Sequence, residues 1–250
     1  MKKIWILLSL ISLLACNKDI IVPQSDLEKN GLSGDVVCIT SIETESTDGQ
    51  DLQEVFVKRA VTHYNEFGNK IDEIWYAQDS SIIRRFEYFY NSNNEKITEK
   101  YFESDGQLFL ETSYEYKKGK LVSSVCKYAD GTIESKYQYE YNRYNLLSKK
   151  IFLDGNDNIQ GTHTYQYDSK GNITEDKWEH IQYMDYNWHL YYEYDENNFL
   201  VADRMYDGKN APTYTSEYQY ITDNNNNWIQ KIETRDGIPS CLTLRLIEYK

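Results

Sequence analysis

Polar and apolar residues alternate along most of this chain, in stretches of about nine residues separated by short polar turns. In residues 133–141, for example, the odd positions carry Ile133, Ser135 and three tyrosines, whereas the even positions carry Glu, Lys and Gln. A period of two places successive side chains on opposite faces of a β-strand and does not fit a helix. Residues 108–116, 186–194 and 214–220 repeat the pattern. It therefore predicts half-buried antiparallel strands with tyrosines on the buried face.

A tyrosine that directly precedes a polar turn recurs at intervals of 25 to 29 residues. These tyrosines are Tyr64, Tyr90, Tyr116, Tyr141, Tyr167, Tyr194, Tyr220 and Tyr249. A second turn, usually Asp-Gly, follows half a repeat later, at Asp105-Gly106, Asp130-Gly131, Asp154-Gly155, Asp207-Gly208 and Asp236-Gly237. Such dipeptides supply the positive φ that tight hairpins need. Each unit of about 26 residues is therefore predicted to form two strands and two turns.

About seven such units predict roughly fourteen strands, and the stretches Val36–Glu43 and Glu54–Tyr64 add two more. The tyrosine face cannot stay wet across so many strands, and no helical segment stands out that could cover it. A twisted sheet of this length has to curl on itself. We therefore expect an all-β domain, a long antiparallel meander of tandem β-hairpins that is coiled or rolled on itself, open or closed, with tyrosines inside.

The first sixteen residues have the features of a targeting segment. Lys2 and Lys3 give a positive start, residues 4–14 are apolar, and Ala15 precedes Cys16. The apolar run is too short to cross a bilayer of about 30 Å as a helix. Its end resembles the lipobox of bacterial lipoproteins, and the alternative is an ordinary secretory signal. We expect a signal peptide at 1–15, lipidation of Cys16, an anchored linker at 16–32 and the repeat domain at 33–250.

The residues after Cys16 bear on location. In lipoproteins an aspartate directly after the cysteine favours retention at the inner membrane, and this chain has Asn17 there. Lys18-Asp19 resembles a short signal for export to the cell surface, with ordinary linker polarity as the equal alternative. We therefore expect an outer-membrane protein that is held to the membrane by its lipid anchor, on the periplasmic face or at the cell surface.

Charge and cysteine count exclude several classes of partner and site. The net charge is −13, and no basic patch stands out, which argues against nucleic acid as a partner. Cys38, Cys126 and Cys241 remain besides Cys16, and no two cysteines are spaced as C-x-x-C. An odd number cannot pair completely within one chain, so a disulfide framework is excluded, although one pair stays possible.

Two segments carry a family resemblance. Residues 165–173 read Tyr-Gln-Tyr-Asp-Ser-Lys-Gly-Asn-Ile, and residues 192–200 read Tyr-Glu-Tyr-Asp-Glu-Asn-Asn-Phe-Leu. They resemble the YD-repeat family of Rhs-type and teneurin-like proteins, and the resemblance covers most of residues 60–250. The arginine that usually follows the glycine is absent here. Large members form shells around a toxin, for which seven repeats are too few, so the resemblance implies a coiled antiparallel sheet and an extracytoplasmic location.

Candidate chemistry is sparse. The histidines have no metal-ligand spacing; His163 is expected on the inner face and His189 on the polar face of its strand. Residues 154–158 begin like a calcium loop, but Ile159 and Tyr165 stand where glycine and glutamate are required. Residues 223–227 are interpreted as a long loop. The acidic residues recur on every repeat, which indicates a structural role, and we expect no catalytic residues, no metal and no cofactor.

The repeat is interrupted at residues 178–188, where the Asp-Gly turn is missing. This segment gathers the candidate binding residues Trp178, His180, Tyr183, Tyr186 and Trp188. Exposed rings there would stack on sugars or anchor a protein. The alternative is a longer hairpin whose rings pack on the edge of the sheet.

Three functions follow from these features. The first is a non-catalytic binding or scaffold module with an envelope protein as partner, and the alternative is a carbohydrate-binding lipoprotein that uses aromatic platforms. An envelope glycosidase is the third. A porin-like membrane barrel is the main structural rival, but it requires an apolar lipid-facing surface.

Overall fold

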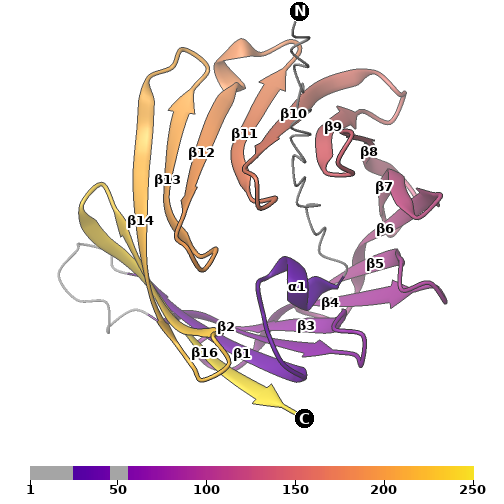
Figure 1. Ribbon diagram of the computed structural model, residues 1–250. Helices are drawn as coiled ribbons and strands as arrows, with labels where there is room; N and C mark the ends of the chain where they lie inside the picture. The colour runs from indigo at the N-terminus through magenta and orange to yellow at the C-terminus, as the bar shows by residue number, and fades with distance from the viewer. Residues whose placement is uncertain (1–24, 46–55) are drawn as a thin grey trace, which may run out of the picture.

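The computed structural model describes residues 25–45 and 56–250, which form one closed antiparallel barrel (Figure 1). The expected signal peptide and the expected lipidation of Cys16 lie outside the described residues. The helical segments are α1 (Asp26–Lys29) and the 3-10 turn η1 (Met184–Tyr186). The strands are β1 (Val36–Glu45), β2 (Phe56–Tyr64), β3 (Lys70–Tyr76), β4 (Ile82–Tyr90), β5 (Lys96–Glu103), β6 (Leu108–Lys117), β7 (Lys120–Tyr128), β8 (Ile133–Tyr141), β9 (Leu147–Leu153), β10 (Ile159–Tyr167), β11 (Ile173–His180), β12 (Trp188–Tyr194), β13 (Leu200–Asp207), β14 (Pro212–Thr222), β15 (Trp228–Arg235) and β16 (Ile238–Tyr249).

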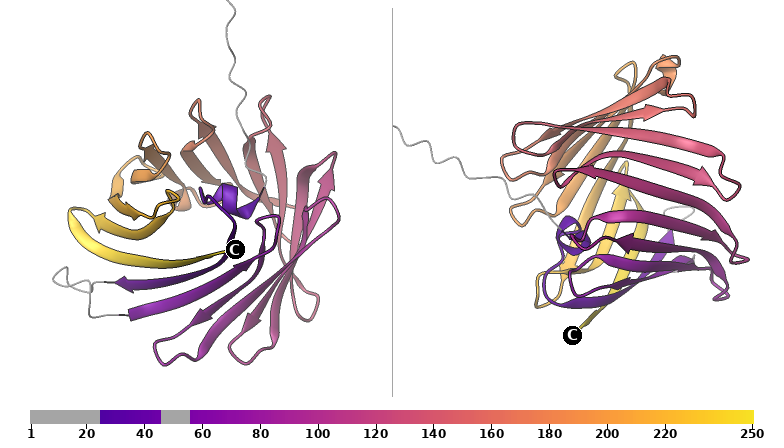
Figure 2. Two further views of the ribbon diagram at one scale, coloured as in Figure 1. Left: turned by 60° about the horizontal axis from the view of Figure 1, so that its bottom comes forward. Right: turned by 90° about the vertical axis from the view of Figure 1, so that its right-hand side faces the viewer.

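The sheet is a meander in which each strand pairs with its neighbours in sequence, as the hairpin pattern predicts. The sequence left open whether the sheet closes. In the structure β1 pairs with β16 as well as with β2, and the register runs from Val36 opposite Tyr249 to Glu45 opposite Cys241. Figure 2 shows the strands inclined to the barrel axis, as closure requires.

The turns at the two ends of the barrel have similar chemistry. Their first residue is often Asp or Asn, whose side chain accepts backbone N–H groups two and four residues on, as Asp168 does from Lys170 and Asn172. In these turns the fourth residue has positive φ and is Gly, Asn, Asp or Ser. The prediction that Asp-Gly supplies positive φ holds at Gly106 but is wrong at Asp154-Gly155 and Asp207-Gly208, where the aspartate begins the turn and Asp157 or Asn210 has the positive φ.

A β-bulge accompanies the recurring tyrosine in most repeats. The register shifts next to Tyr64, Tyr90, Tyr116, Tyr141, Tyr167 and Tyr194. Bulges increase local twist and bend the strand, so their repetition favours a sheet that coils. We call the barrel end that carries these turns the tyrosine end, and the opposite end, where η1 lies, the η1 end.

The tyrosines face the interior, as the alternation predicts. Tyr114 and Tyr116 in β6 are half-buried, whereas Ser113 and Glu115 on the other face are exposed. Apart from Tyr64, which is buried, the inward tyrosines of the strands are only partly buried, so the interior is not packed solid and solvent reaches it. This agrees with the width of a sixteen-stranded barrel, which is too large for side chains to fill.

The outer face carries charged pairs across neighbouring strands. His63 lies opposite Asp72, and Glu87 lies between Asp72 and Lys100. The outward Arg85 Nη2 lies 3.2 Å from Glu87 Oε1. A porin-like membrane barrel needs an apolar outer face, because charges that face lipid cost free energy. The charged pairs on the outer face of this barrel do not meet that requirement.

The N-terminal segment docks inside the tyrosine end. Ser25 and Glu28 form a capping box on α1, and Leu27 packs in a buried cluster with Leu32, Val36, Ile39 and Tyr64. Figures 1 and 2 show α1 within the ring of strands. The expectations that no helical segment covers the inner face and that 16–32 is only a linker are therefore wrong for residues 25–32. No helix in the described part of the chain is long and apolar enough to span a membrane.

Asp26 and Asn227 hold this segment in place. Asp26 Oδ2 accepts hydrogen bonds from Lys70 N (3.0 Å) and Tyr90 Oη (2.9 Å). Asn227 is fully buried, accepts a hydrogen bond from Ser33 N and donates one to Ser33 O. Residues 223–227 thus form a tight turn that clamps the chain before β1, and the interpretation as a long loop is wrong.

Replacement of Asp26 by alanine is expected to loosen α1. Burial raises the pKa of the Asp26 carboxyl, but the hydrogen bond from Lys70 N, the charge of Lys29 and the hydrogen bond from Tyr90 lower it more, to a net value below the ordinary 3.8. The carboxylate therefore stabilises the folded state at higher pH, and this contribution is lost as pH falls below 3.8 through the folded-state pKa. Removing it should cost about 1–3 kcal/mol near pH 7.

The measurement is denaturant unfolding between pH 2.5 and 7, with hydrogen exchange of the Lys70 amide. Lys29→Ala is the control, since that exposed side chain should change stability by less than about 1 kcal/mol. Unchanged protection of the Lys70 amide in Asp26→Ala would show that α1 does not depend on this carboxylate.

Candidate functional site

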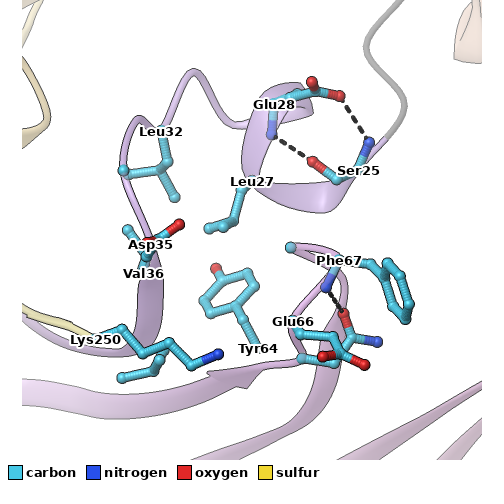
Figure 3. A pocket seen from close by; sticks show the side chains of 14 residues that line it. Ser25, Leu27, Glu28, Leu32, Asp35, Val36, Tyr64, Glu66, Phe67 and Lys250 are labelled. Atoms are coloured by element: carbon cyan, nitrogen blue, oxygen red, sulfur yellow. Dashed lines mark hydrogen bonds between the residues drawn. The ribbon is translucent and has the colours of Figure 1, made fainter.

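A cleft lies between α1 and the barrel wall at the tyrosine end (Figure 3). It has a cavity volume of about 390 Å³. Leu27, Leu32 and Val36 line one part of it beside the ring of Tyr64, with Lys250 next to Val36, while Glu66 and Phe67 border its other side (Figure 3). Because most of its apolar surface belongs to the cluster that docks α1, the cleft is first a packing seam of the fold.

The five candidate binding residues from the interrupted repeat lie together at the η1 end. Trp178 and His180 close β11, Trp188 opens β12, and Tyr183 and Tyr186 lie in the connection between them. Trp178 lies opposite Trp188 on one side and opposite His163 on the other. Because His163 faces the interior, both tryptophan rings face it too. The structure therefore brings these five residues together, and their role in binding stays a prediction.

Ring contacts link these residues from the interior to the rim. His180 lies 6.2 Å from Trp178 and 4.9 Å from Tyr183 between ring centroids, and Tyr183 lies 5.9 Å from Tyr186. All three separations fall in the range of favourable aromatic pairs. Tyr183 is 56% exposed and Tyr186 is 68% exposed, whereas both tryptophans are partly buried. The alternative in which the rings all pack on the sheet edge does not describe these two tyrosines.

Three further rings extend the cluster along the inner wall. His163 lies 4.6 Å from Trp178 and 5.6 Å from Trp188, and Phe152 lies 6.4 Å from Trp178. Tyr137 stacks on Phe152 at 5.4 Å. We call the eight residues the aromatic wall: Tyr137, Phe152, His163, Trp178, His180, Tyr183, Tyr186 and Trp188.

Sequence reasoning placed His163 and Tyr137 on the inner face but did not join them to the site, because their contacts depend on the register of β8 to β12. Phe152 was missed altogether. It follows Ser148-Lys149-Lys150-Ile151, in which the alternation of polar and apolar residues is too weak to assign a face.

Backbone and side-chain hydrogen bonds fix the connection that carries the exposed rings. His180 Nδ1 accepts from the backbone N–H groups of Gln182 and Tyr183, both at 3.1 Å. Asn187 Oδ1 accepts from His180 N at 2.8 Å. A Cβ at Gly208 would lie 2.7 Å from Met184 O, so this glycine lets the β13–β14 turn approach η1 closely. The β11–β12 connection, which carries the exposed rings, is therefore fixed by its own hydrogen bonds and by contact with the β13–β14 turn.

The interior next to the wall is lined by tyrosine hydroxyls and carboxylates. Tyr114 Oη donates to Glu99 at 2.9 Å and Tyr218 Oη donates to Asp203 at 2.5 Å. Burial, reinforced by nearby acidic groups, raises the pKa of the Tyr114 and Tyr218 hydroxyls. For the same reasons the pKa of Tyr167 rises to about 12. The tyrosines therefore remain neutral hydrogen-bond donors near pH 7.

The histidines and acidic turns have local partners. His163 Nδ1 lies 2.9 Å from Asp176 Oδ1, and His189 faces outward, as predicted. Asp154 Oδ1 accepts from Asn156 N and Asn158 N, so the calcium-like segment is a hydrogen-bonded turn. Cys38, Cys126 and Cys241 are free thiols. Within the described ranges, no three His, Cys, Asp or Glu side chains are grouped to hold a metal ion.

Comparison with known proteins identifies a related fold. A porin-like protein from Bacteroides uniformis matches with a TM-score of 0.56 and 10% identity, over 85% of this chain and 96% of that one. A second porin-like protein, from Bacteroides vulgatus, matches with a TM-score of 0.35 and 11% identity over 87% and 99% of the two chains. The Photorhabdus luminescens Tc holotoxin pore matches with a TM-score of 0.32 and 12% identity over 78% of this chain and 13% of that one.

The sequence comparisons add no family. No protein-family model matches the chain, and no curated protein matches it. The resemblance to YD repeats therefore stays a prediction. At 10% identity the Bacteroides uniformis match shows a shared antiparallel β-barrel fold.

Replacement of Gly161 by alanine is expected to displace the wall. A Cβ at this position would lie 2.5 Å from Cη2 of Trp178 and 2.8 Å from Glu179 O, and the backbone cannot yield cheaply. We expect a loss of about 1–3 kcal/mol in unfolding free energy and a changed near-ultraviolet circular dichroism of the tryptophans. Gly155→Ala is the control, because its Cβ would meet only Ile133 at 3.8 Å. Equal stability of the two variants would contradict the close packing of Trp178 on β10.

Proposed function

We propose that this protein is a non-catalytic binding module of the bacterial cell envelope, and that its aromatic wall holds an extended glycan at the η1 end of the barrel. One observation carries the proposal. The wall joins interior rings such as Trp178 to exposed rings such as Tyr186 by continuous contacts. A row of rings of this kind suits sugar residues, which offer apolar faces for stacking and hydroxyls for hydrogen bonds.

The surroundings of the wall support this assignment. Tyrosine hydroxyls and carboxylates in the interior can donate and accept hydrogen bonds, and solvent reaches them because they are only partly buried. Five of the eight residues of the aromatic wall lie at the break in the repeat, at 178–188, whereas the carboxylates that would be needed for glycoside cleavage recur as parts of the hydrogen-bonded lining. Binding is therefore favoured over catalysis.

Envelope location is part of the proposal and rests on the N-terminal sequence. The signal-like start and Cys16 would tether the barrel to the outer membrane, on the periplasmic face or at the cell surface. The charged outer face of the strands suits a barrel that stands in water beside the membrane. We retain the YD-repeat resemblance as the proposed origin of its hairpins.

A protein partner is the second candidate, favoured by an apolar row on the outer face. Ile221, Leu244 and Leu246 are 53%, 41% and 65% exposed. Gln230 lies between Ile221 and Leu244 in the register, so these side chains share one surface of β14 to β16. An exposed apolar patch of this kind commonly marks a protein interface.

The test is glycan binding by residues 17–250, which retain every described residue. We expect saturable binding to at least one glycan on a broad bacterial and host panel. Tyr186→Ala and Trp188→Ala should each weaken it about tenfold, a loss of about 1.4 kcal/mol in binding free energy. Tyr186 is exposed, so its removal leaves the fold intact.

Tyr191→Ala is the matched control, because Tyr191 lies on the outer face of β12, the strand that begins with Trp188. Binding that Tyr191→Ala reduces as much as Tyr186→Ala would place the ligand outside the barrel. A folded protein that binds no glycan, and that cross-links in the envelope through Leu246, would replace this proposal by the protein-partner module.

A further inference from the structure

Lys150 is an inward-facing cation that has no carboxylate partner among the described residues. It lies in β9 opposite Tyr139 on one side and His163 on the other. Its Nζ lies 3.9 Å from the centroid of the Tyr137 ring. Among residues 25–45 and 58–250, no group forms a hydrogen bond or an ion pair with this ammonium, and it is not enclosed. Burial lowers the pKa of Lys150, and only the charge of Asp176 opposes this shift.

In the described part of the chain, carboxylates that face the same interior have partners within the barrel. Glu43 forms an ion pair with Lys58. Others accept side-chain hydrogen bonds as follows: Glu73 from Lys70 and Trp75, Glu99 from Lys96 and Tyr114, Asp176 from His163, Asp203 from Tyr218, and Glu233 from Ser216 and Arg235. The chain has 40 acidic and 27 basic residues, so bases do not lack potential partners. Lys150 is therefore unpaired because of where it lies in the interior, and not because the chain lacks acidic residues.

Lys150 stands beside the surface on which a sugar would stack. Phe152 follows it on the same face of β9 and contacts Trp178, while His163 opposite Lys150 contacts both tryptophans. Asp176 is held by His163 and is not within ion-pair distance of Lys150. An anionic group on a bound ligand would therefore meet the Lys150 ammonium at this place, where no carboxylate of the described residues is free to compete with it.

Elsewhere in the interior, two cations lie against a second ring, that of Trp228. Arg245 Cζ lies 3.3 Å and Lys231 Nζ lies 5.7 Å from the centroid of Trp228. Neither side chain has a carboxylate partner in the described part of the chain, and Arg245 Nε and Nη1 are buried without a hydrogen bond. The interior thus pairs an aromatic surface with an unpaired cation at Tyr137, at Trp228 and also at Trp75, where Arg84 Cζ lies 4.2 Å from the ring centroid and Arg84 Nε is buried without a hydrogen bond.

We propose that the ligand of the aromatic wall is an acidic saccharide, and that Lys150 binds its anionic group. The proposal rests on the proposed glycan-binding function and narrows it to sugars that bear a carboxylate or a sulfate. The ring of such a sugar stacks on the wall and its anion lies against the Lys150 ammonium, which replaces the missing ion pair. An ammonium brought near an anion in a partly desolvated site gives selectivity over a neutral analogue.

The experiment compares charged probes with neutral counterparts of the same backbone. Oligogalacturonate and its methyl ester form the carboxylate arm, and chondroitin sulfate and desulfated chondroitin oligosaccharides form the sulfate arm. Binding to residues 17–250 is measured by isothermal titration calorimetry. We expect the charged member of at least one arm to bind at least tenfold tighter than its neutral counterpart, and the arm that responds identifies the anion.

Three variants assign the preference to Lys150. Lys150→Met should remove the tenfold preference for the charged probe over its neutral counterpart, and Lys150→Arg should retain it. Lys149→Met is the matched control, because Lys149 lies outward opposite Glu140 and should have no effect. Thermal unfolding of each variant checks that the barrel is intact.

The outcomes separate this inference from the function on which it rests. Equal affinity for charged and neutral probes, or a preference that survives Lys150→Met, overturns the assignment of Lys150 but leaves glycan binding in place. If Lys149→Met loses the preference to the same extent as Lys150→Met, the assignment of Lys150 is also overturned. If the folded protein binds neither these probes nor any glycan on the panel, both proposals fall together.

Discussion

Pairing of the first strand with the last is the interaction on which the rest of this structure depends. A meander of sixteen strands that stayed open would expose two edges, each with a row of unpaired N–H and C=O groups. The ladder between β1 and β16 satisfies both rows and separates an inside from an outside. Only because this ladder exists does the tyrosine face become an interior, and only then can α1 dock within it.

Tyrosine suits an interior of this width because it has an apolar ring and a polar tip. The ring packs along the wall, and the hydroxyl reaches a neighbouring strand, as Tyr167 Oη does to Leu147 O at 2.6 Å and Tyr220 Oη to Leu200 O at 2.9 Å. Aliphatic side chains in the same places would leave apolar surface facing water. The repeated tyrosine therefore stabilises the wall without filling the space that it encloses.

The candidate site arises where the repeat fails. Every regular unit returns through a tight turn, whereas the β11–β12 connection is longer and carries η1 with its exposed rings. The regular units supply a rigid support, and the irregular one supplies the exposed rings of Tyr183 and Tyr186. Lys150 and Phe152 belong to this support, and they acquire a place at the site because β9 lies next to β10 in the ring of strands.

The strands, their inward tyrosines, the turn positions and the cluster at 178–188 can be predicted from the sequence, because they follow from a period of two and from local turn chemistry. The sequence also predicts two strands before the repeats, close to the observed β1 and β2. Local patterns do not encode which distant strands meet, so the tertiary structure alone shows that Val36 pairs with Tyr249 and that the sheet closes. For the same reason it alone decided that residues 25–32 fold into the barrel and that Tyr137, Phe152 and Lys150 join the aromatic site. Those contacts arise from cross-strand register and from curvature summed over many bulges, and no single segment of the chain determines either.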